Sequence, residues 1–407
     1  MAVPGNARAA APTDKWDMEK LSRPVKTWPM PQFECPQDGV HAVLIEGDVN
    51  GEIDSRHTRF GPLTRFFAYW GLPKDASPSN RVPAMVLVHG GGGTAYPKWV
   101  RRWTDRGYAA IAMDNTGFLP VNYGDAGRAR IQCAMPLPWD ASFCHGKEPL
   151  DRQWVWHAVA SVIRSHTFIR SLPEVDGSKV GVTGVSWGGF LTCISASVDH
   201  RFCFAAPVYG CGFLGNRSHW KDKFLSDEIG LAWLALWDPS HYLPFAECPF
   251  LWMDGTNDFA YPLDSLQMSI DCVKPQSFRS TRIRWPHGHG EVSEGPREIQ
   301  VFADHFTKGS PQLPSFKGFS TSGGRVSAQF DACGRTVKCV HLVYTEDMNP
   351  SWPKREFKTG TAHFDEATSG IVAEVPEGAV LYYLNAETED GLMASSRWEM
   401  KEKKKDE

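Results

Sequence analysis

The chain has 407 residues, of which 42% are hydrophobic and 22% are charged, and its formal net charge is −4 at pH 7. This composition is typical of a globular protein with one large domain and a smaller companion, and no basic stretch favours a nucleic acid partner. No apolar run approaches the roughly 20 residues that cross a bilayer, and residues 1–34 lack the apolar centre of a signal peptide. We therefore expect no membrane segment, and either a cytoplasmic protein or a secreted or periplasmic one whose signal peptide has been removed.

Strand-like and helical segments alternate through residues 39–309, after an N-terminal extension at 1–38. The segments at 40–45 and 65–72 predict an antiparallel start. Residues 151–172 have apolar side chains at helical spacing. Strands alternating with helices predict an α/β fold with a doubly wound, mostly parallel sheet, which binds ligands at the carboxyl ends of its strands. The short apolar runs that predict strands buried on both faces are 84–90, 108–114, 179–184, 249–255 and 281–285.

The composition changes after residue 309. Residues 310–324 are rich in Ser, Pro and Gly, which predicts a linker. Residues 325–400 contain strand-like segments with turn residues between them and no clear helix, so we predict a small C-terminal β-sandwich-like domain. Residues 401–407 form a charged tail.

Ten cysteines are scattered along the chain without a C-x-x-C pair, so the sequence gives no support for a zinc site or for thioredoxin-like chemistry. Cys133 with Cys144, and Cys333 with Cys339, are pairs that would form disulfides in an exported protein. Buried free thiols are the alternative that we favour.

A serine between glycines follows the strand-like run at 179–184. Gly184 and Gly188 lie two positions on either side of Ser186, and a helical segment follows. This G-x-S-x-G pattern between a strand and a helix is typical of a nucleophile presented on a strained turn; an ordinary crossover turn is the alternative. A serine nucleophile needs an imidazole within hydrogen-bond reach and an acid that orients the imidazole.

The acid and the base are expected downstream, at strand ends. Asp258 lies in the loop after the run at 249–255, whereas its rival Asp254 ends that run, so we favour Asp258 as the acid. Two histidines follow the last apolar run. We favour His289 as the base because it lies between two glycines on an exposed turn, with His287 as the alternative.

Two backbone amides would stabilise the negative charge that develops on a carbonyl oxygen during the attack. One is the N–H of Trp187, directly after the serine. The other is expected from the glycine-rich segment at 89–99, at Gly91 or Gly92. A phosphate-binding loop is the alternative, but no G-K-[ST] follows.

A long segment between residues 211 and 248 is expected to roof the site. Its Trp220, Trp233 and Trp237, together with Trp187, have flat rings that would stack on a sugar or on an aromatic acyl group. For each of the three tryptophans of the roof taken singly, core packing is the interpretation that we favour.

The segments H-G-G-G-G-T-A-Y, S-K-V-G-V-T-G-V-S-W-G-G-F, D-G-T-N-D-F-A-Y-P and P-H-G-H-G-E follow in an order that resembles the α/β-hydrolase superfamily, and within it the acetylxylan esterase and dienelactone hydrolase-like branch. The resemblance covers about residues 40–307. It implies that Ser186 is the nucleophile, Asp258 the acid and His289 the base, with the Trp187 amide as an oxyanion donor. The motif S-W-G-G departs from the branch, which often has glutamine after the serine, and is similar to the S-Y-G-G of prolyl oligopeptidase-like peptidases.

We therefore predict a serine carboxylester hydrolase that removes acetyl groups from carbohydrate esters and needs no metal or organic cofactor. A prolyl oligopeptidase-like peptidase and a dienelactone-type hydrolase are the alternatives among enzymes. A glycan-binding protein with an idle triad is the alternative from a different class.

Overall fold

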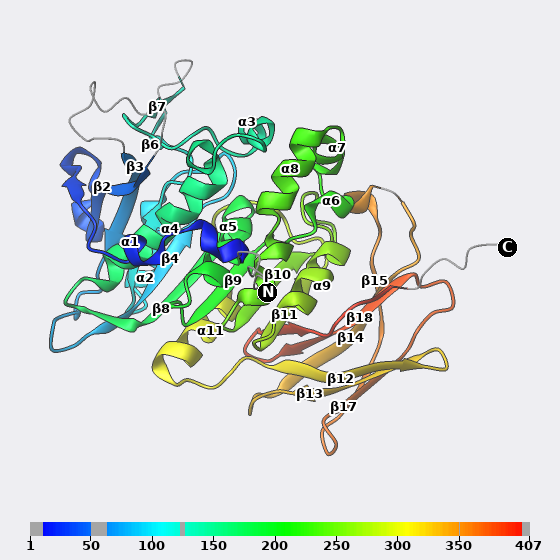
Figure 1. Ribbon diagram of the computed structural model, residues 1–407. Helices are drawn as coiled ribbons and strands as arrows, with labels where there is room; N and C mark the ends of the chain where they lie inside the picture. Colours follow the sequence, from blue (N-terminus) through cyan, green and yellow to red (C-terminus); the bar gives the residue numbers. More distant parts are fainter. Residues whose placement is uncertain (1–10, 50–62, 123–126, 350, 401–407) are drawn as a thin grey trace, which may run out of the picture.

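The computed structural model describes residues 11–49, 63–122, 127–349 and 351–400. Its largest sheet has nine strands in the order β1-β2-β3-β5-β4-β8-β9-β10-β11, with helices on both faces (Figure 1). Neighbouring strands are antiparallel from β1 to β5 and parallel from β5 to β11. The prediction of a doubly wound, mostly parallel sheet with an antiparallel start is confirmed. The strands are β1 Thr27–Pro29, β2 Val40–Val49, β3 Leu63–Gly71, β4 Val82–Val88, β5 Ala109–Met113, β8 Val175–Val185, β9 Phe204–Val208, β10 Phe250–Gly255 and β11 Ser277–Arg282.

The longest helix, α4 Trp154–Arg170, lies within the predicted range 151–172. Apolar residues occur on all its sides because the sheet covers one side and the N-terminal segment covers another: the Trp16 indole N–H donates to the Trp156 carbonyl at 2.9 Å. Residues 15–23 of the predicted extension therefore pack on α4, and β1 adds a strand to the sheet. The other helices are α1 Met18–Leu21, α2 Pro97–Thr104, α3 Trp139–Ser142, α5 Trp187–Val198, α6 Leu214–Arg217, α7 Lys221–Leu225, α8 Glu228–Trp237, α9 Leu263–Cys272, α10 Glu291–Glu294 and α11 Arg297–Lys308; β6 Phe118–Asn122 and β7 Arg128–Arg130 form a separate ribbon.

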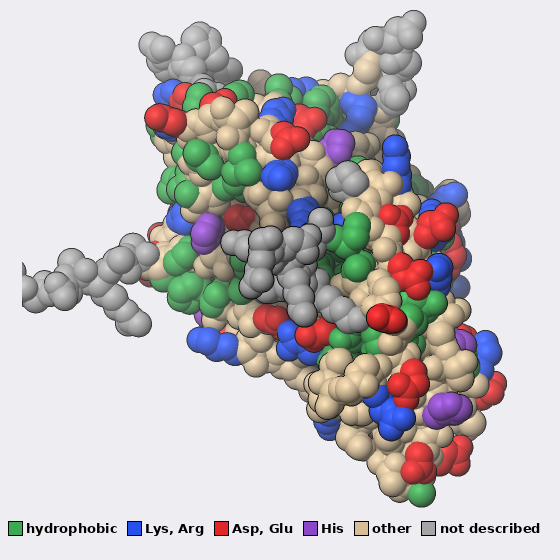
Figure 2. Space-filling model, turned by 90° about the vertical axis from the view of Figure 1, so that its right-hand side faces the viewer, with side chains coloured by type: hydrophobic (Ala, Val, Ile, Leu, Met, Phe, Trp, Pro, Cys, Tyr) green, Lys and Arg blue, Asp and Glu red, His purple; other side chains and the backbone are tan. Residues whose placement is uncertain are grey.

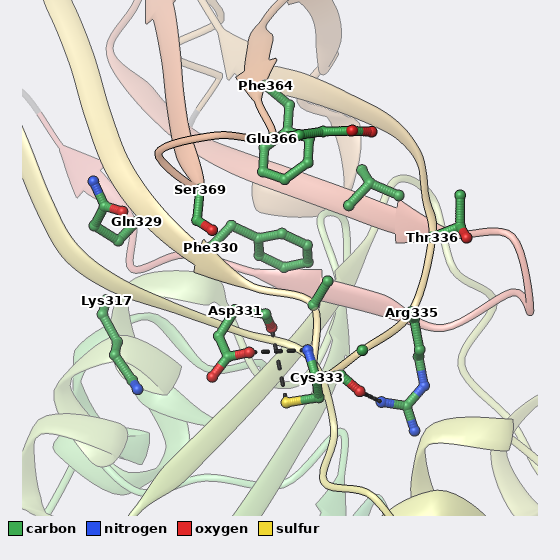
Figure 3. A pocket seen from close by; sticks show the side chains of 13 residues that line it. Lys317, Gln329, Phe330, Asp331, Cys333, Arg335, Thr336, Phe364, Glu366 and Ser369 are labelled. Atoms are coloured by element: carbon green, nitrogen blue, oxygen red, sulfur yellow. Dashed lines mark hydrogen bonds between the residues drawn. The ribbon is translucent and has the colours of Figure 1, made fainter.

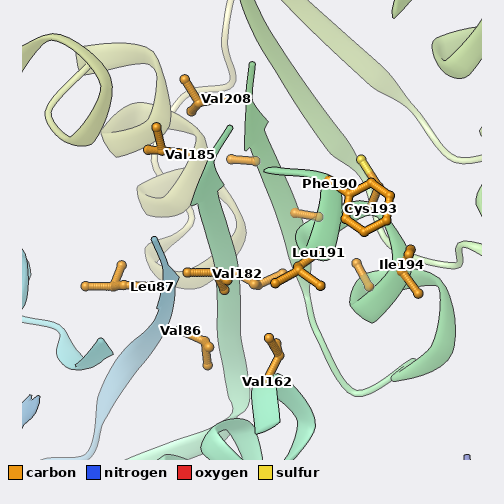
Figure 4. Packing of buried hydrophobic residues seen from close by; sticks show 14 of the residues in the cluster. Val86, Leu87, Val162, Val182, Val185, Phe190, Leu191, Cys193, Ile194 and Val208 are labelled. Carbon is orange, nitrogen blue, oxygen red and sulfur yellow. The ribbon is translucent and has the colours of Figure 1, made fainter. Parts of the chain in front are cut away.

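The middle strands of the sheet are buried on both faces. Val86 of β4, Val182 of β8 and Leu191 of α5 are fully buried, and Figure 4 shows their side chains packed among these elements. Continuous apolar runs mark strands that lie between two layers of helices. The core keeps β4 and β8 in register up to the pair Val88 and Gly184, so the loops that follow both strands begin at the same edge of the sheet.

The C-terminal domain consists of two antiparallel sheets. Their shared core includes Phe330, Leu342 and Leu384. Residues 315–322, inside the range predicted as a linker, form β12, because a Ser- and Gly-rich edge strand pairs through its backbone and buries few side chains. One sheet contains β12 Ser315–Ser322, β13 Arg325–Asp331, β17 Gly370–Glu374 and β16 His363–Asp365; the other contains β15 Lys358–Thr361, β14 Val337–Thr345, β18 Leu381–Thr388, β19 Met393–Ser395 and β20 Glu399–Met400.

The C-terminal domain docks on β11, the outermost strand of the large sheet (Figure 1). The Thr281 N–H donates to Ser395 Oγ at 2.8 Å, and the Thr281 carbonyl accepts from Asn385 Nδ2 at 3.0 Å. The Trp352 indole N–H donates to the Thr256 carbonyl at 2.9 Å, just after β10. These bonds satisfy backbone groups that an open sheet edge would expose. In the view of Figure 2, acidic and basic side chains are interspersed on both domains.

No disulfide joins any of the ten cysteines, and Cys193, Cys211 and Cys248 are buried thiols. Among the helices that the structure describes, none has the length and apolar character needed to cross a membrane.

Candidate active site

Ser186 lies at the sharp turn between β8 and α5, where its backbone has φ 58° and ψ −118°. Residues with a side chain rarely adopt positive φ, so the turn holds this serine in a strained conformation. The flanking glycines make the turn sterically possible: a Cβ on Gly188 would lie 1.9 Å from the Val88 carbonyl oxygen, and one on Gly184 would lie 2.2 Å from the Gly188 oxygen. The G-x-S-x-G segment thus forms the strand–turn–helix unit that presents a serine side chain.

We expect Gly188→Ala to lower the free energy of unfolding by about 3 kcal/mol, because the new methyl group would overlap the backbone of β4. Gly378→Ala is a matched control, since its Cβ would meet only the flexible side chain of Glu346, at 3.4 Å. Urea unfolding followed by tryptophan fluorescence measures both variants. Equal stability of the two would show that close packing at this turn does not limit stability.

Asp258 lies in the loop after β10 and is buried. Its Oδ1 accepts from the backbone N–H groups of Ala260 and Tyr261, both at 2.8 Å. Its Oδ2 lies 2.5 Å from Nδ1 of His287. The carboxylate is therefore held from one side by the backbone and orients the imidazole on the other, as an acid in a catalytic triad does.

Tyr209 connects this imidazole with the turn that presents the serine. Its ring stacks on His287, with centroids 4.5 Å apart and planes at 26°, and its hydroxyl donates to the Pro286 carbonyl at 2.7 Å. The preceding residue, Val208, accepts from the Ser186 N–H at 2.8 Å. Residues 208 and 209, at the carboxyl end of β9, thus contact both the serine turn after β8 and the histidine loop after β11, at the edge where an α/β sheet binds its ligand.

His289, the base that we favoured from the sequence, does not contact Asp258. Its Nδ1 lies 2.9 Å from Oε1 of Glu294, and its Nε2 accepts from the Gly90 N–H at 2.9 Å. The structure thus pairs the acid with the alternative, His287, because the loop after Pro286 brings the first histidine to Asp258 and turns the second toward the glycine-rich loop. Both nitrogens of His289 are occupied, whereas Nε2 of His287 has no partner within the described part of the chain.

Asp254, the rival acid, is fully buried at the end of β10 and contacts no histidine. Its Oδ1 accepts from the Gly255 N–H at 2.7 Å, and its Oδ2 has no hydrogen-bond partner among the described residues. Burial, together with the nearby Asp258 carboxylate, raises the pKa of Asp254 well above its usual range. Because Asp254 has no hydrogen bond to a histidine among the described residues, its carboxyl group does not orient an imidazole there.

The glycine-rich loop after β4 lies against the serine. A Cβ on Gly90 would lie 3.0 Å from the Ser186 Cβ, and one on Gly91 would lie 2.9 Å from Cδ1 of Trp187. The backbone can approach this closely only because both positions are glycine. The Gly91 N–H donates to no acceptor in the part of the chain that the structure describes, and the Trp187 N–H opens helix α5, where amides lack an intrahelical partner. Gly92 has φ +70° and no neighbour within 4 Å of a Cβ position.

The tryptophans predicted as the roof fall into two groups. Trp233 is 1% exposed and stacks on Phe224, and Trp237 is fully buried with its indole N–H donating to Gln153. Both are core residues, which corrects their assignment as substrate contacts: α7 and α8 fold over the segment around Phe143 and enclose them. Trp220 is half-buried, and its ring lies 4.6 Å from that of Trp187.

A hollow of about 610 Å³ lies in the C-terminal domain, away from Ser186 (Figure 3). Phe330 and Phe364 form part of its wall, and Cys333 lines it with its thiol directed to the Leu313 carbonyl. No histidine lines this hollow, so Cys333 has no base there. No group of three or more His, Cys, Asp or Glu side chains within the described ranges is arranged to hold a metal ion.

The chain is similar to known esterases over part of its length. A scan against models of protein families finds no match. Acetyl esterase Axe7A of Xylanibacter ruminicola is 26% identical over 223 residues, which are 51% of this chain and 48% of that protein, so the match spans about half of the relative's length.

The solved structures that it resembles include acetyl xylan esterases. The enzyme from Paenibacillus sp. R4 is 18% identical, with a TM-score of 0.55 over 74% of this chain and 95% of that one. The enzyme from Thermoanaerobacterium is 15% identical, with a TM-score of 0.49 over 71% and 92%. The protein therefore has the α/β-hydrolase fold, with an acetyl esterase among its sequence relatives.

Proposed function

We propose that the protein is a serine carboxylester hydrolase that removes short acyl groups, with acetylated carbohydrate as its substrate class. The observation that carries this proposal is the buried Asp258–His287 pair at the sheet edge where Ser186 is presented on its strained turn. The likeness to an acetyl esterase supports the acyl group. We revise the base to His287, since Asp258 orients that residue.

The mechanism follows from these positions. Ser186 Oγ attacks the ester carbonyl carbon while His287 Nε2 takes its proton, and Asp258 stabilises the resulting imidazolium. The N–H groups of Trp187 and Gly91 stabilise the negative charge on the carbonyl oxygen. The C–O bond to the alcohol then breaks, and His287 returns the proton to that oxygen. Water attacks the acyl-enzyme in the same way, which releases the acid and restores the serine.

The surroundings of Trp187 support a short acyl group. The indole is 3% exposed and contacts the rings of Trp154, Phe190 and Trp220 at centroid distances of 5.8, 5.0 and 4.6 Å. The backbone of Gly91 forms a fourth contact, since a Cβ there would lie 2.9 Å from Cδ1 of the indole. Space beside the proposed oxyanion donors is thus filled by aromatic rings, so a long acyl chain would have to displace them.

The aromatic rings beside His287 favour a leaving alcohol that has a flat ring face. Phe259 is 48% exposed and its ring lies 4.7 Å from that of His287, which would donate a proton to the departing alcohol. His219 lies 5.8 Å from Phe259 and 5.6 Å from Trp220, so three rings form an arc on this side. Aromatic faces stack on sugar rings or on aromatic alcohols.

The test is hydrolysis of p-nitrophenyl esters from acetate to octanoate, with acetylated xylan and an acetyl p-nitroanilide measured alongside. We expect the highest kcat/KM for acetate, a decline as the chain lengthens, release of acetate from the xylan and almost no cleavage of the anilide. Faster cleavage of the anilide than of the ester would favour a peptidase. Retention of xylan without turnover of any ester would favour a glycan-binding protein.

A further inference from the structure

A second histidine–carboxylate pair lies two residues beyond the proposed base. Gly90 donates its N–H to Nε2 of His289, so this nitrogen is an acceptor and the imidazole proton resides on Nδ1, facing Glu294 Oε1 at 2.9 Å. The Glu294 side chain is 7% exposed and also accepts from the Gly290 N–H at 3.1 Å. The carboxylate therefore fixes the tautomer of His289, as well as the orientation of its ring.

The partner of His289 is a backbone group of the glycine-rich loop. On the other side of Gly90, its carbonyl accepts from Nδ1 of the buried His89 at 2.8 Å and from the Gly93 N–H at 3.1 Å. Gly90 is therefore held by two histidines: its N–H donates to His289, and its carbonyl accepts from His89. Because the peptide that follows is planar and trans, the Gly91 N–H points opposite to the Gly90 carbonyl.

We propose that His289 is a positioning residue for the hydrolysis: together with Glu294 it holds Gly90 in place and thereby aims the Gly91 amide at the oxyanion. The proposal rests on the proposed function for its consequence in catalysis. The loop of residues 287–289 then has two roles: it contains the proposed base, His287, and through His289 it holds the peptide that carries the oxyanion donor. A Cβ on Gly90 would lie 3.0 Å from Ser186 and 3.4 Å from His289 Nε2, which places the held peptide between the nucleophile and this histidine.

The protonation state of His289 decides whether the contact exists. Titratable groups that face it are Glu294, His89, His287 and Tyr96, whose ring lies 4.7 Å away; the Trp99 ring packs at 5.9 Å. Burial lowers the pKa of His289, and the hydrogen bond that His289 donates to Glu294 opposes this only in part. With a pKa below its ordinary value of 6.5, the acceptor at Nε2 is present above that pH and is lost as the pH falls through the lowered pKa. A protonated ring would turn an N–H toward the Gly90 N–H, two donors that repel each other.

The kinetic test compares His289→Leu, which cannot accept a hydrogen bond, with His289→Gln, whose side-chain carbonyl accepts one at every pH. We expect His289→Leu to lower kcat on p-nitrophenyl acetate by about 10²–10³-fold with little change in KM, the effect of losing one oxyanion donor. His289→Gln should recover most of kcat. On the acid side, log kcat/KM should fall more steeply with pH in the wild type than in His289→Gln, because the glutamine carbonyl keeps its acceptor when His289 would be protonated. Wild-type kcat in His289→Leu would overturn the proposal.

A second measurement does not depend on ester hydrolysis. In protein labelled with ¹⁵N at glycine and histidine, we expect the Gly90 amide resonance to shift as His289 titrates, and to stay fixed with pH in His289→Gln. A Gly90 resonance that ignores the titration of His289 would overturn the positioning role, whether or not the protein hydrolyses esters. Loss of the proposed function alone would instead appear as a wild type that shows this coupling but turns over no ester.

Discussion

Ser186→Ala is expected to lower kcat on p-nitrophenyl acetate by about 10⁶-fold, the loss seen when a serine hydrolase is deprived of its nucleophile. The side chain makes no capping hydrogen bond at the start of α5, so its removal leaves the helix intact. Alanine meets the same positive φ as serine, and the strain of the turn is unchanged. Binding of the ester depends on the remaining wall of the site, so KM should change little. Initial rates at saturating ester, with enzyme purified free of host esterases, measure the effect.

Ser195→Ala is the matched control. This serine lies on the same helix, is fully buried, and its hydroxyl has no hydrogen-bond partner among the described residues. We expect activity within about 2-fold of the wild type, since an unpartnered hydroxyl contributes little. If Ser186→Ala retained more than about 1% of the wild-type kcat while Ser195→Ala behaved normally, a nucleophile other than Ser186 would have to be sought.

The central sheet could be predicted because its strands lie between two layers of helices and are apolar throughout. The last strand could not be placed in this way. A strand was predicted at 281–285, but β11 spans Ser277–Arg282, four residues earlier at its start, and its sequence S-F-R-S-T-R is polar. Those polar groups meet the C-terminal domain and Glu298, which Arg282 contacts at 2.6 Å. Periodicity within one segment carries no information about a partner more than 100 residues away.

The candidate site, too, could be predicted from the sequence only in part. The G-x-S-x-G turn and the glycine-rich loop could be recognised because their chemistry depends on residues that are adjacent in sequence. The choice between His287 and His289 depends on how the chain reverses after β11, where Arg284 has φ 49° without being a glycine. Glu294 and Tyr209 could not be predicted as site residues because neither belongs to a motif. Glu294 lies on the four-residue helix α10, and Tyr209 follows β9.

The sequence left the tryptophans of the roof open between core packing and substrate contact, and it could not tell which of them is buried. Trp233 and Trp237 lie in an aromatic segment that was expected to face a ligand, but α8 turns them toward Phe143 and Trp16. These partners come from segments before the nucleophile. The aromatic insertion therefore extends the core, and of its three tryptophans Trp220 is the half-buried one, beside Trp187.

His287→Ala and Asp258→Asn together test the pairing that replaces our first choice of base. We expect His287→Ala to lower kcat by about 10⁶-fold, as strongly as loss of the nucleophile, because neither group works without the other. Asp258→Asn should cost about 10⁴-fold, since an amide leaves the imidazole in the wrong tautomer while the remaining contacts persist. His363→Ala, an exposed histidine of β16, should match the wild type. Steady-state rates on p-nitrophenyl acetate measure all three.

The double variant Ser186→Ala/His287→Ala tests whether the two residues act together, whatever the size of each single loss. If Ser186 and His287 act as a unit, adding His287→Ala to Ser186→Ala lowers kcat no further, because the residual rate comes from the backbone donors and binding alone. Independent roles would instead multiply the two losses. His289→Ala added to Ser186→Ala is expected to reduce that residual rate, since the donor it positions is then the main source of acceleration. Additive losses for Ser186 and His287, with no effect of His289, would mean that the Asp258–His287 pair is structural and that the base lies elsewhere.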